Sequence, residues 1–240
     1  MITRRIGKTA TFVIAIALVA CLVGVARASA CGTDGYSYAG ESATTTASGI
    51  SAIITPLGPF NVLSGHVAGW VGVGGPGQGP NGTDEWLQIG LSGFPGLFSD
   101  VYYEVALPNQ EPVYHQVSVD PSVGKPVAVA VVEILNRRNW WQVVANGTPV
   151  SPPIHLPASH RRWTPIATAE AWDGGTGGAC NAFLYGFRHV STIANPGSSW
   201  RRLVNAYPIT SSSTKLRRRG SSFLAAEGRA AFNALASLQP

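Results

Sequence analysis

The sequence predicts an all-β protein, an antiparallel sandwich of two β-sheets preceded by a signal peptide and followed by a short C-terminal helix. Three observations lead to this prediction. Its 28 glycines and 17 prolines separate short runs rich in Val, Ile, Thr and aromatic residues. Helical periodicity is almost absent before residue 223. The roughly 180 residues between positions 31 and 210 are enough for one domain with a large core.

Ten runs have the length and composition of strands, and that number of short strands is typical of a sandwich. They are Gly49–Ile54, His66–Val73, Glu85–Leu91, Val101–Ala106, Val113–Val119, Val127–Leu135, Trp140–Ala145, Ile166–Trp172, Phe183–His189 and Leu203–Tyr207. After Ser211 the composition changes to serine and arginine, and Phe223–Leu238 has the spacing of an amphipathic helix.

We therefore expect four segments. They are a signal peptide (1–30), an N-terminal strand and linker (31–65), the β-sandwich domain (66–210) and a basic, Ser/Arg-rich tail with a short helix (211–240). The tail is expected to be an appendage rather than part of the core.

The first 30 residues have the three parts of a signal peptide. A basic start precedes the uncharged apolar run Phe12–Val25, which is too short to cross a membrane comfortably. The small residues Ala28–Ala30 follow, in the pattern that signal peptidases cut. We therefore expect a secreted protein. A competing interpretation is a lipoprotein anchored at Cys21, because Leu18–Cys21 resembles a lipobox, but the apolar run continues past this cysteine.

Removal of the leader changes the charge. The formal net charge falls from +5 to +1, because four basic residues and no acidic residue leave with it. Residues 31–210 then hold eight basic and eleven acidic side chains. The composition therefore gives no support for nucleic-acid binding, and no nucleic-acid partner is expected.

Two cysteines, Cys31 and Cys180, remain after Cys21 leaves with the leader. In an oxidising destination they are expected to form a disulfide, with two free thiols as the alternative. The bond would close a loop of about 150 residues, for which the chain-entropy model gives roughly 5 kcal/mol of stabilisation.

Two of the expected strands place a polar residue beside a tryptophan. Side chains alternate between the two faces of a strand, so Gln88 lies on the same face as Trp86, opposite three aliphatic residues. By the same logic Glu170 lies on the same face as Trp172, opposite three alanines. Both polar groups are expected on a half-open face that a ligand can approach. The alternative is that they are ordinary solvated side chains.

Four short segments, in this order, resemble the glutamic peptidases (eqolisins), whose domain is a concanavalin-like jelly roll. They are Gly-Trp-Val-Gly-Val at 69–73, Trp-Leu-Gln-Ile-Gly at 86–90, Tyr-Tyr-Glu at 102–104 with Pro108, and Ala169-Glu170. The resemblance covers roughly residues 66–190, and its specificity comes from the order and spacing of the motifs.

The resemblance implies an endopeptidase. Glu170 would activate a water molecule, and Gln88 would position that water and donate a hydrogen bond to the developing oxyanion. The polypeptide substrate would be bound by Trp70, Trp86, Tyr103, Glu104 and Trp172. No cofactor is implied, and a monomer is expected.

The chain departs from the family's pattern at Leu91-Ser92-Gly93, where the family usually has an acidic residue. This difference concerns the proton network close to Gln88. Because family members are made as precursors, removal of a propeptide between Cys31 and Gly65 is a further hypothesis.

Other classes have less support. Gly90–Phe94 lacks the last glycine of a G-x-S-x-G elbow. The five histidines, at positions 66, 115, 155, 160 and 189, lack the spacing of metal ligands, so no metal is expected. Glu104 and Glu170 could form the carboxylate pair of a glycosidase.

The main alternative is a non-catalytic concanavalin-like module that stacks the sugar rings of a glycan or cell-surface polymer on its aromatic residues.

Overall fold

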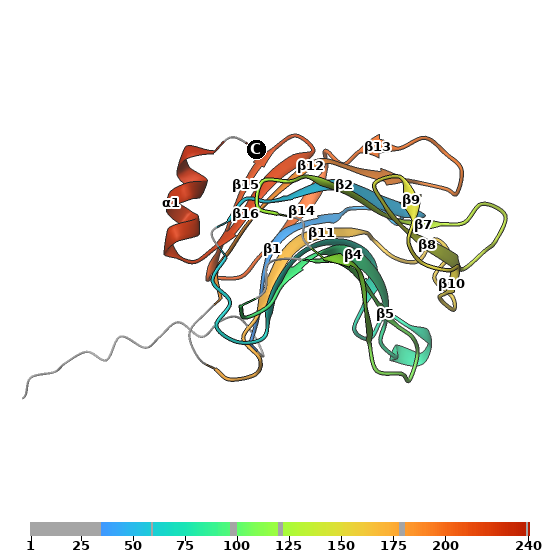
Figure 1. The fold of residues 1–240 in the computed structure, drawn as a ribbon. Coiled ribbons are helices and arrows are strands. Elements are labelled where there is room, and N and C mark those ends of the chain that lie inside the picture. Colours follow the sequence, from blue (N-terminus) through green and yellow to red (C-terminus); the bar gives the residue numbers. More distant parts are fainter. Residues whose placement is uncertain (1–34, 59, 97–99, 120–121, 178–180, 239) are drawn as a thin grey trace, which may run out of the picture.

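The protein is a sandwich of two antiparallel β-sheets (Figure 1). The structure, a computed structural model, describes residues 35–240 except 59, 97–99, 120–121, 178–180 and 239. The predicted fold class is therefore confirmed, including the short helix near the C-terminus. The expected signal peptide and both residues of the expected disulfide, Cys31 and Cys180, lie outside the described residues.

One sheet is strongly curved, and we call it the concave sheet (Figure 1). Its seven strands lie in the order β14-β1-β11-β3-β4-β5-β6. Their bounds are β1 Tyr36–Ala43, β3 His66–Gly75, β4 Glu85–Gly93, β5 Asp100–Ala106, β6 Val113–Val119, β11 Ile166–Trp172 and β14 Ala206–Thr210.

The second sheet covers the back of the first, and we call it the convex sheet. Its main order is β10-β8-β7-β2-β12-β16-β15, with β9 beside β8 and β13 beside β12. The bounds are β2 Gly49–Pro56, β7 Val127–Glu133, β8 Trp140–Ala145, β9 Thr148–Pro149, β10 Ile154–His155, β12 Phe183–Ile193, β13 Arg201–Arg202, β15 Thr214–Arg219 and β16 Ser222–Glu227. A 3-10 turn, η1 (Pro80–Gly82), and the helix α1 (Arg229–Ser237) complete the elements.

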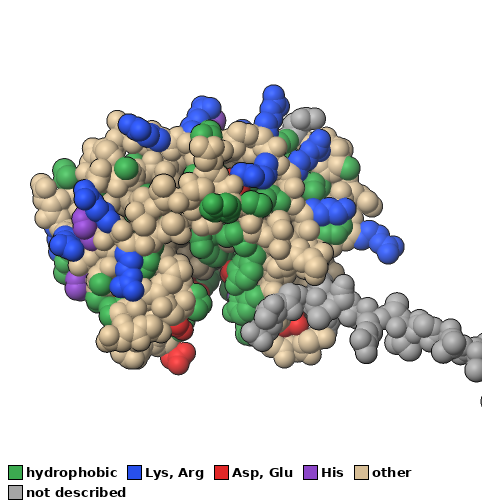
Figure 2. Space-filling view, turned by 180° about the vertical axis from the view of Figure 1, so that it is seen from behind, with side chains coloured by type: hydrophobic (Ala, Val, Ile, Leu, Met, Phe, Trp, Pro, Cys, Tyr) green, Lys and Arg blue, Asp and Glu red, His purple; other side chains and the backbone are tan. Residues whose placement is uncertain are grey.

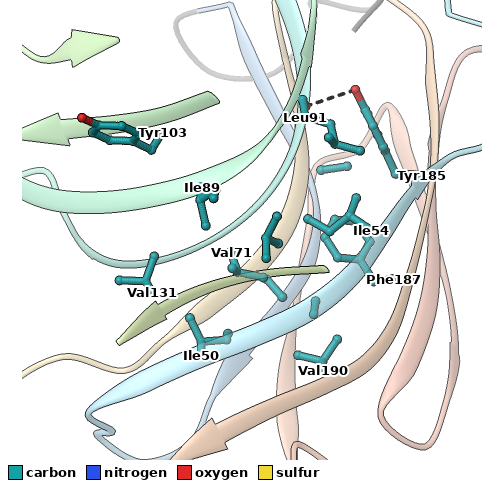
Figure 3. Close-up of a cluster of buried hydrophobic side chains, with 14 of the residues drawn as sticks. Ile50, Ile54, Val71, Ile89, Leu91, Tyr103, Val131, Tyr185, Phe187 and Val190 are labelled. Atoms are coloured by element: carbon teal, nitrogen blue, oxygen red, sulfur yellow. Dashed lines mark hydrogen bonds between the residues drawn. The ribbon is translucent and has the colours of Figure 1, made fainter. Parts of the chain in front are cut away.

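The core lies between the sheets and is built by alternate residues of each strand. Ile89 and Leu91 of β4 are fully buried against side chains of the convex sheet that include Ile54 and Phe187 (Figure 3). Each such side chain contributes about 1.5–3 kcal/mol when it leaves water. The Tyr185 hydroxyl donates a hydrogen bond to the carbonyl of Leu91 at 3.4 Å, which ties the two sheets together.

Nine of the ten expected strands occur with their ends shifted by no more than four residues. The tenth, expected at 203–207, is found as β14 at Ala206–Thr210. The sequence interpretation missed β1, β15, β16 and the three two-residue strands. In β1 the sequence Tyr-Ser-Tyr-Ala-Gly-Glu-Ser-Ala has few aliphatic residues, so no strand-like run of Val and Ile marks it.

The expectation that 211–240 is an appendage is wrong. Strand β16 pairs with β12, and Phe223 is fully buried with its ring stacked on Phe187 at 4.4 Å. The segment expected to form one helix from Phe223 therefore begins as a strand, β16. The helix starts only at Arg229, after Gly228, whose φ is 90°.

Helix α1 covers the outer face of the convex sheet, where Leu184 and Leu224 pack against Ala231 and Leu235. The guanidinium of Arg217 donates hydrogen bonds to the carbonyls of Leu235 and Leu238, at 3.1 and 2.9 Å. A cation at this position satisfies the free carbonyls at the helix end and complements the helix dipole. Part of the basic tail therefore holds the helix in place.

The segment 31–65, expected to be one strand and a linker, supplies a strand to each sheet. Strand β1 lies between β14 and β11, and β2 lies between β7 and β12. Removing a propeptide up to Gly65 would take an interior strand from both sheets, which argues against that hypothesis. Among the described residues, no helix is both long and apolar enough to span a membrane.

We predict that Phe223→Ala lowers the free energy of unfolding by about 3–5 kcal/mol, because it leaves a cavity between the sheets. Phe232→Ala, on the half-buried face of α1, serves as the matched control and should cost about 1 kcal/mol. Urea denaturation followed by circular dichroism measures both. Equal losses would contradict the role of β16 in the core.

Candidate active site

A cavity of about 650 Å³ opens on the concave sheet. Figure 2 shows the hollow at the lower edge of the molecule, between two lobes. Its walls are the side chains that point away from the core, and seven of them are aromatic. These are Tyr36, Tyr38, Trp70, Trp86, Phe94, Tyr102 and Tyr114. The volume lies in the range usual for ligand sites, and its mainly aromatic walls favour an organic ligand.

Gln88 and Glu170 line this same cavity. Strand β3 lies between β4, which carries Gln88, and β11, which carries Glu170. Because glycine has no side chain, the glycines of β3 leave space above this face of the sheet. A Cβ on Gly72 would lie 2.9 Å from the Cβ of Gln88, so only glycine leaves room for the amide there. Both side chains are nearly buried, with 8% and 6% of their surface exposed. The sheet thus brings the two expected catalytic residues to one wall of one cavity.

Glu170 is accompanied by a histidine that the sequence interpretation did not select. The Nε2 atom of His66 lies 3.3 Å from Oε1 of Glu170. The imidazole is surrounded by the rings of Tyr36, Phe94 and Trp172, with centroid distances of 6.3, 6.1 and 5.7 Å. The aromatic rings hold the imidazole in contact with the carboxylate. The available signal was strand alternation, which places His66 on the same face of β3 as Trp70.

The amide of Gln88 is oriented by a tyrosine. Its Nε2 donates to the hydroxyl oxygen of Tyr102 at 3.1 Å. Burial raises the pKa of Tyr102 well above its usual value, and the charge of Glu170 raises it further. The phenol therefore stays protonated throughout the range in which proteins work, and it offers the amide a stable neutral partner.

A second carboxylate, Glu104, also faces the cavity. It lies opposite Gln88 in the pairing of β4 with β5, and it accepts a hydrogen bond from Trp86 Nε1 at 2.9 Å. Burial raises the pKa of Glu104, and the negative charge of Glu170 raises it further. The hydrogen bond from Trp86 and the nearby His66 lower it. The net direction is upward, so Glu104 keeps its proton to higher pH than a solvated glutamate.

In the segment Leu91-Ser92-Gly93, which departs from the family's pattern, Ser92 lies beside a carboxylate of the neighbouring strand. The Ser92 hydroxyl donates a hydrogen bond to Oδ1 of Asp100 on β5. Tyr114 donates to the same oxygen at 2.7 Å, and Gln116 donates to the other carboxylate oxygen at 2.7 Å. Three donors therefore hold the Asp100 carboxylate beside Ser92, so a carboxylate remains in this part of the site although it comes from the neighbouring strand.

The other expected binding residues divide into two groups. Trp70, Trp86 and Glu104 line the cavity, and Trp172 packs against His66 and Tyr36, which line it. The assignment of Tyr103 to substrate binding is wrong, because this residue is buried in the core and stacks on His115 at 4.4 Å.

Strand alternation explains this error. Adjacent residues point to opposite faces, so Tyr103 cannot share a face with Glu104, and Tyr102 takes its place on the cavity wall.

Among the described residues, no group of three or more His, Cys, Asp and Glu side chains is placed to hold a metal ion. The functional groups on the cavity wall include carboxylates, an amide, an imidazole and phenols.

Known proteins resemble this chain in fold but not in sequence. No protein-family model matches the sequence, and no curated protein matches it. The structure is similar to Scytalido-glutamic peptidase in complex with a peptide-based transition-state analogue, with a TM-score of 0.56 and 15% identity over 80% of this chain and 98% of that one. The chain has the fold of the glutamic peptidases.

A second glutamic-peptidase structure agrees. SCP-B, a member of the eqolisin family in complex with the tripeptide Ala-Ile-His, gives a TM-score of 0.55 and 15% identity over the same shares of the two chains. The glutamic-peptidase jelly roll expected from the short motifs is thereby confirmed as the fold.

We predict a pH-dependent stability that depends on Glu85, a fully buried residue at the start of β4. Burial raises the pKa of Glu85 to about 7, with Arg162 opposing the shift. The folded state therefore holds a proton that the unfolded state releases at lower pH, so this contribution to stability is complete below about pH 4.5 and is lost as the pH rises through 7.

Glu85→Gln should remove this dependence and stabilise the protein by about 1–3 kcal/mol at pH 8, since one pKa unit corresponds to about 1.4 kcal/mol. Thermal melts at pH 5 and pH 8 measure the effect. Glu111→Gln, at an exposed carboxylate, is the control. A wild type and a Glu85→Gln variant with the same pH dependence would contradict the prediction.

Proposed function

We propose that the protein is a secreted glutamic-peptidase-like endopeptidase, with Glu170 as general base and Gln88 as oxyanion donor. The observation that carries the proposal is the convergence of these two side chains, from strands on either side of β3, on the wall of one aromatic cavity. The similar Scytalido-glutamic peptidase binds a peptide-based transition-state analogue, which supports a polypeptide substrate here.

The proposed reaction begins with a water molecule between the two side chains. Glu170 takes a proton from this water, and the water oxygen attacks the carbonyl carbon of the scissile peptide. The tetrahedral intermediate carries a negative oxygen, to which the Gln88 amide N–H donates a hydrogen bond. Collapse breaks the C–N bond, and the protonated Glu170 returns its proton to the leaving amine.

The environment suits this division of roles. A neutral amide stabilises the oxyanion without titrating, and its contribution is large because water is mostly excluded from a nearly buried group. His66 lies beside Glu170, with its Nε2 atom 3.3 Å from Oε1 of the carboxylate, and helps to hold this side chain in position. The aromatic rings and Ile166 and Ile209 give the cavity apolar walls, which favour substrates with apolar side chains next to the scissile bond.

We predict that Glu170→Gln and Gln88→Ala each lower kcat for cleavage of a denatured protein by at least about 10²-fold, the range measured for loss of one general base or one oxyanion donor. A series of digests from pH 3 to pH 8 provides the measurement. Glu111→Gln changes an exposed carboxylate and should retain full activity. Proteolysis at the same rate in all four proteins would refute the assignment.

The seven aromatic rings of the cavity also favour a non-catalytic glycan-binding module, because sugar rings stack on aromatic faces. In that case the protein should bind a polysaccharide column, lose binding by about tenfold or more with Trp70→Ala, and show no proteolysis at any pH. Proteolysis that depends on Glu170, without retention on the column, would decide for the peptidase.

A further inference from the structure

Six exposed arginines belong to segments that lie at the end of the sandwich opposite α1 (Figure 1). They come in pairs from the β7–β8 turn, from the loop before β11 and from β13, and we call this region the arginine end. Its members are Arg137, Arg138, Arg161, Arg162, Arg201 and Arg202. In the sequence these pairs are up to 65 positions apart, so only the fold makes them one surface.

Specific contacts join the three segments. The Arg161 guanidinium donates to Oδ1 of Asn195, on the β12–β13 connection, at 2.7 Å. The backbone N–H of His160 donates to Oδ1 of Asn139, on the β7–β8 turn, at 2.8 Å. Leu135 lies against the same β12–β13 connection, since a Cβ on Gly197 would be 3.0 Å from its Cδ1. The three arginine pairs therefore lie on loops that touch one another.

Little exposed negative charge balances this region. Two acidic residues close to it are buried. Glu85 is near enough to Arg162 for the guanidinium to oppose the rise of its pKa. Glu133 accepts hydrogen bonds from Ser48, from the Asn139 N–H and from His160. The exposed acidic residues of the described part are Asp84 and Glu111, and both belong to loops of the concave sheet. In Figure 2 basic side chains lie over the upper face and sides of the molecule, and acidic ones lie at the lower edge.

Two large apolar side chains project among the arginines. Leu135 is 58% exposed and Trp200 is 44% exposed. They lie on neighbouring loops, and Trp200 directly precedes Arg201. A single exposed leucine is ordinary, but a tryptophan and a leucine on adjacent projecting loops, flanked by arginines, match the chemistry of a lipid interface. There the apolar groups enter the headgroup boundary and the guanidinium groups bind phosphate.

We propose that the arginine end binds the surface of an anionic phospholipid membrane. Projecting loops favour a membrane over an extended polyanion, because a polyanion would bind along a groove, and the cavity of the concave sheet contains the carboxylates Glu104 and Glu170. The arginine end also touches the rim of that cavity, since Trp163, next to Arg162, donates its indole N–H to the Gln78 carbonyl at 3.2 Å. Membrane binding would therefore hold the cavity close to the lipid surface.

The test is co-sedimentation of the mature protein with vesicles. Vesicles of phosphatidylglycerol and phosphatidylcholine should bind the protein, and pure phosphatidylcholine vesicles should not. Binding should weaken between 20 and 300 mM salt, because surface charges are screened. Arg138→Ala combined with Arg202→Ala should weaken vesicle binding about 30-fold, the effect expected for two basic residues at a charged surface.

The matched control combines Lys125→Ala with Arg229→Ala, which removes the same charge from exposed positions away from the arginine end, and it should change binding less than about threefold. Trp200→Ala should reduce the binding that remains at 300 mM salt.

Thermal melts verify that every variant is folded. Equal losses in both double variants, binding to neutral vesicles, or binding to soluble polyphosphate but not to vesicles would each overturn the proposal.

Discussion

The alternation of side chains across the concave sheet is the constraint on which the rest of the structure depends. On β4 the odd-numbered Leu87, Ile89 and Leu91 form the core, which forces Trp86 and Gln88 onto the opposite face. On β11 three alanines face the core and Glu170 faces the cavity. A slip of one residue in either strand would bury a polar group and expose the core. The packing of the core therefore fixes the position of the candidate site.

The same rule explains how much of the structure could be predicted from sequence. It placed Gln88 and Glu170 on their faces correctly, because each strand has an unambiguous apolar side. For Tyr103 the family resemblance was followed instead of the alternation, which places this residue on the core face, opposite Glu104. Strand β1 was missed because its buried residues are small or polar. One of them, Glu41, is held by Arg218, which lies 177 positions away in the sequence. His66 was missed for a similar reason, since its partner Glu170 is 104 positions away.

Burial also changes the meaning of the charge composition. In the described part, Glu41, Glu85, Asp100, Glu133, Glu170, Asp173 and Glu227 are all buried. The basic residues, in contrast, remain mostly exposed. Residues 31–240 have a formal net charge of only +1, but a partner approaching from solvent meets a largely cationic surface away from the cavity. The sequence could not show this, because it gives the number of carboxylates and not their depth.

The position of β1 has a consequence for the order in which the chain can fold. The first described strand pairs only with β11 and β14, and Ser37 on it donates a hydrogen bond to Glu227, 190 positions later. Almost the whole chain must therefore be synthesised before its first strand has a place to go. Contacts of such long range make folding slow, so β1 is expected to join the concave sheet only after the C-terminal strands have been made.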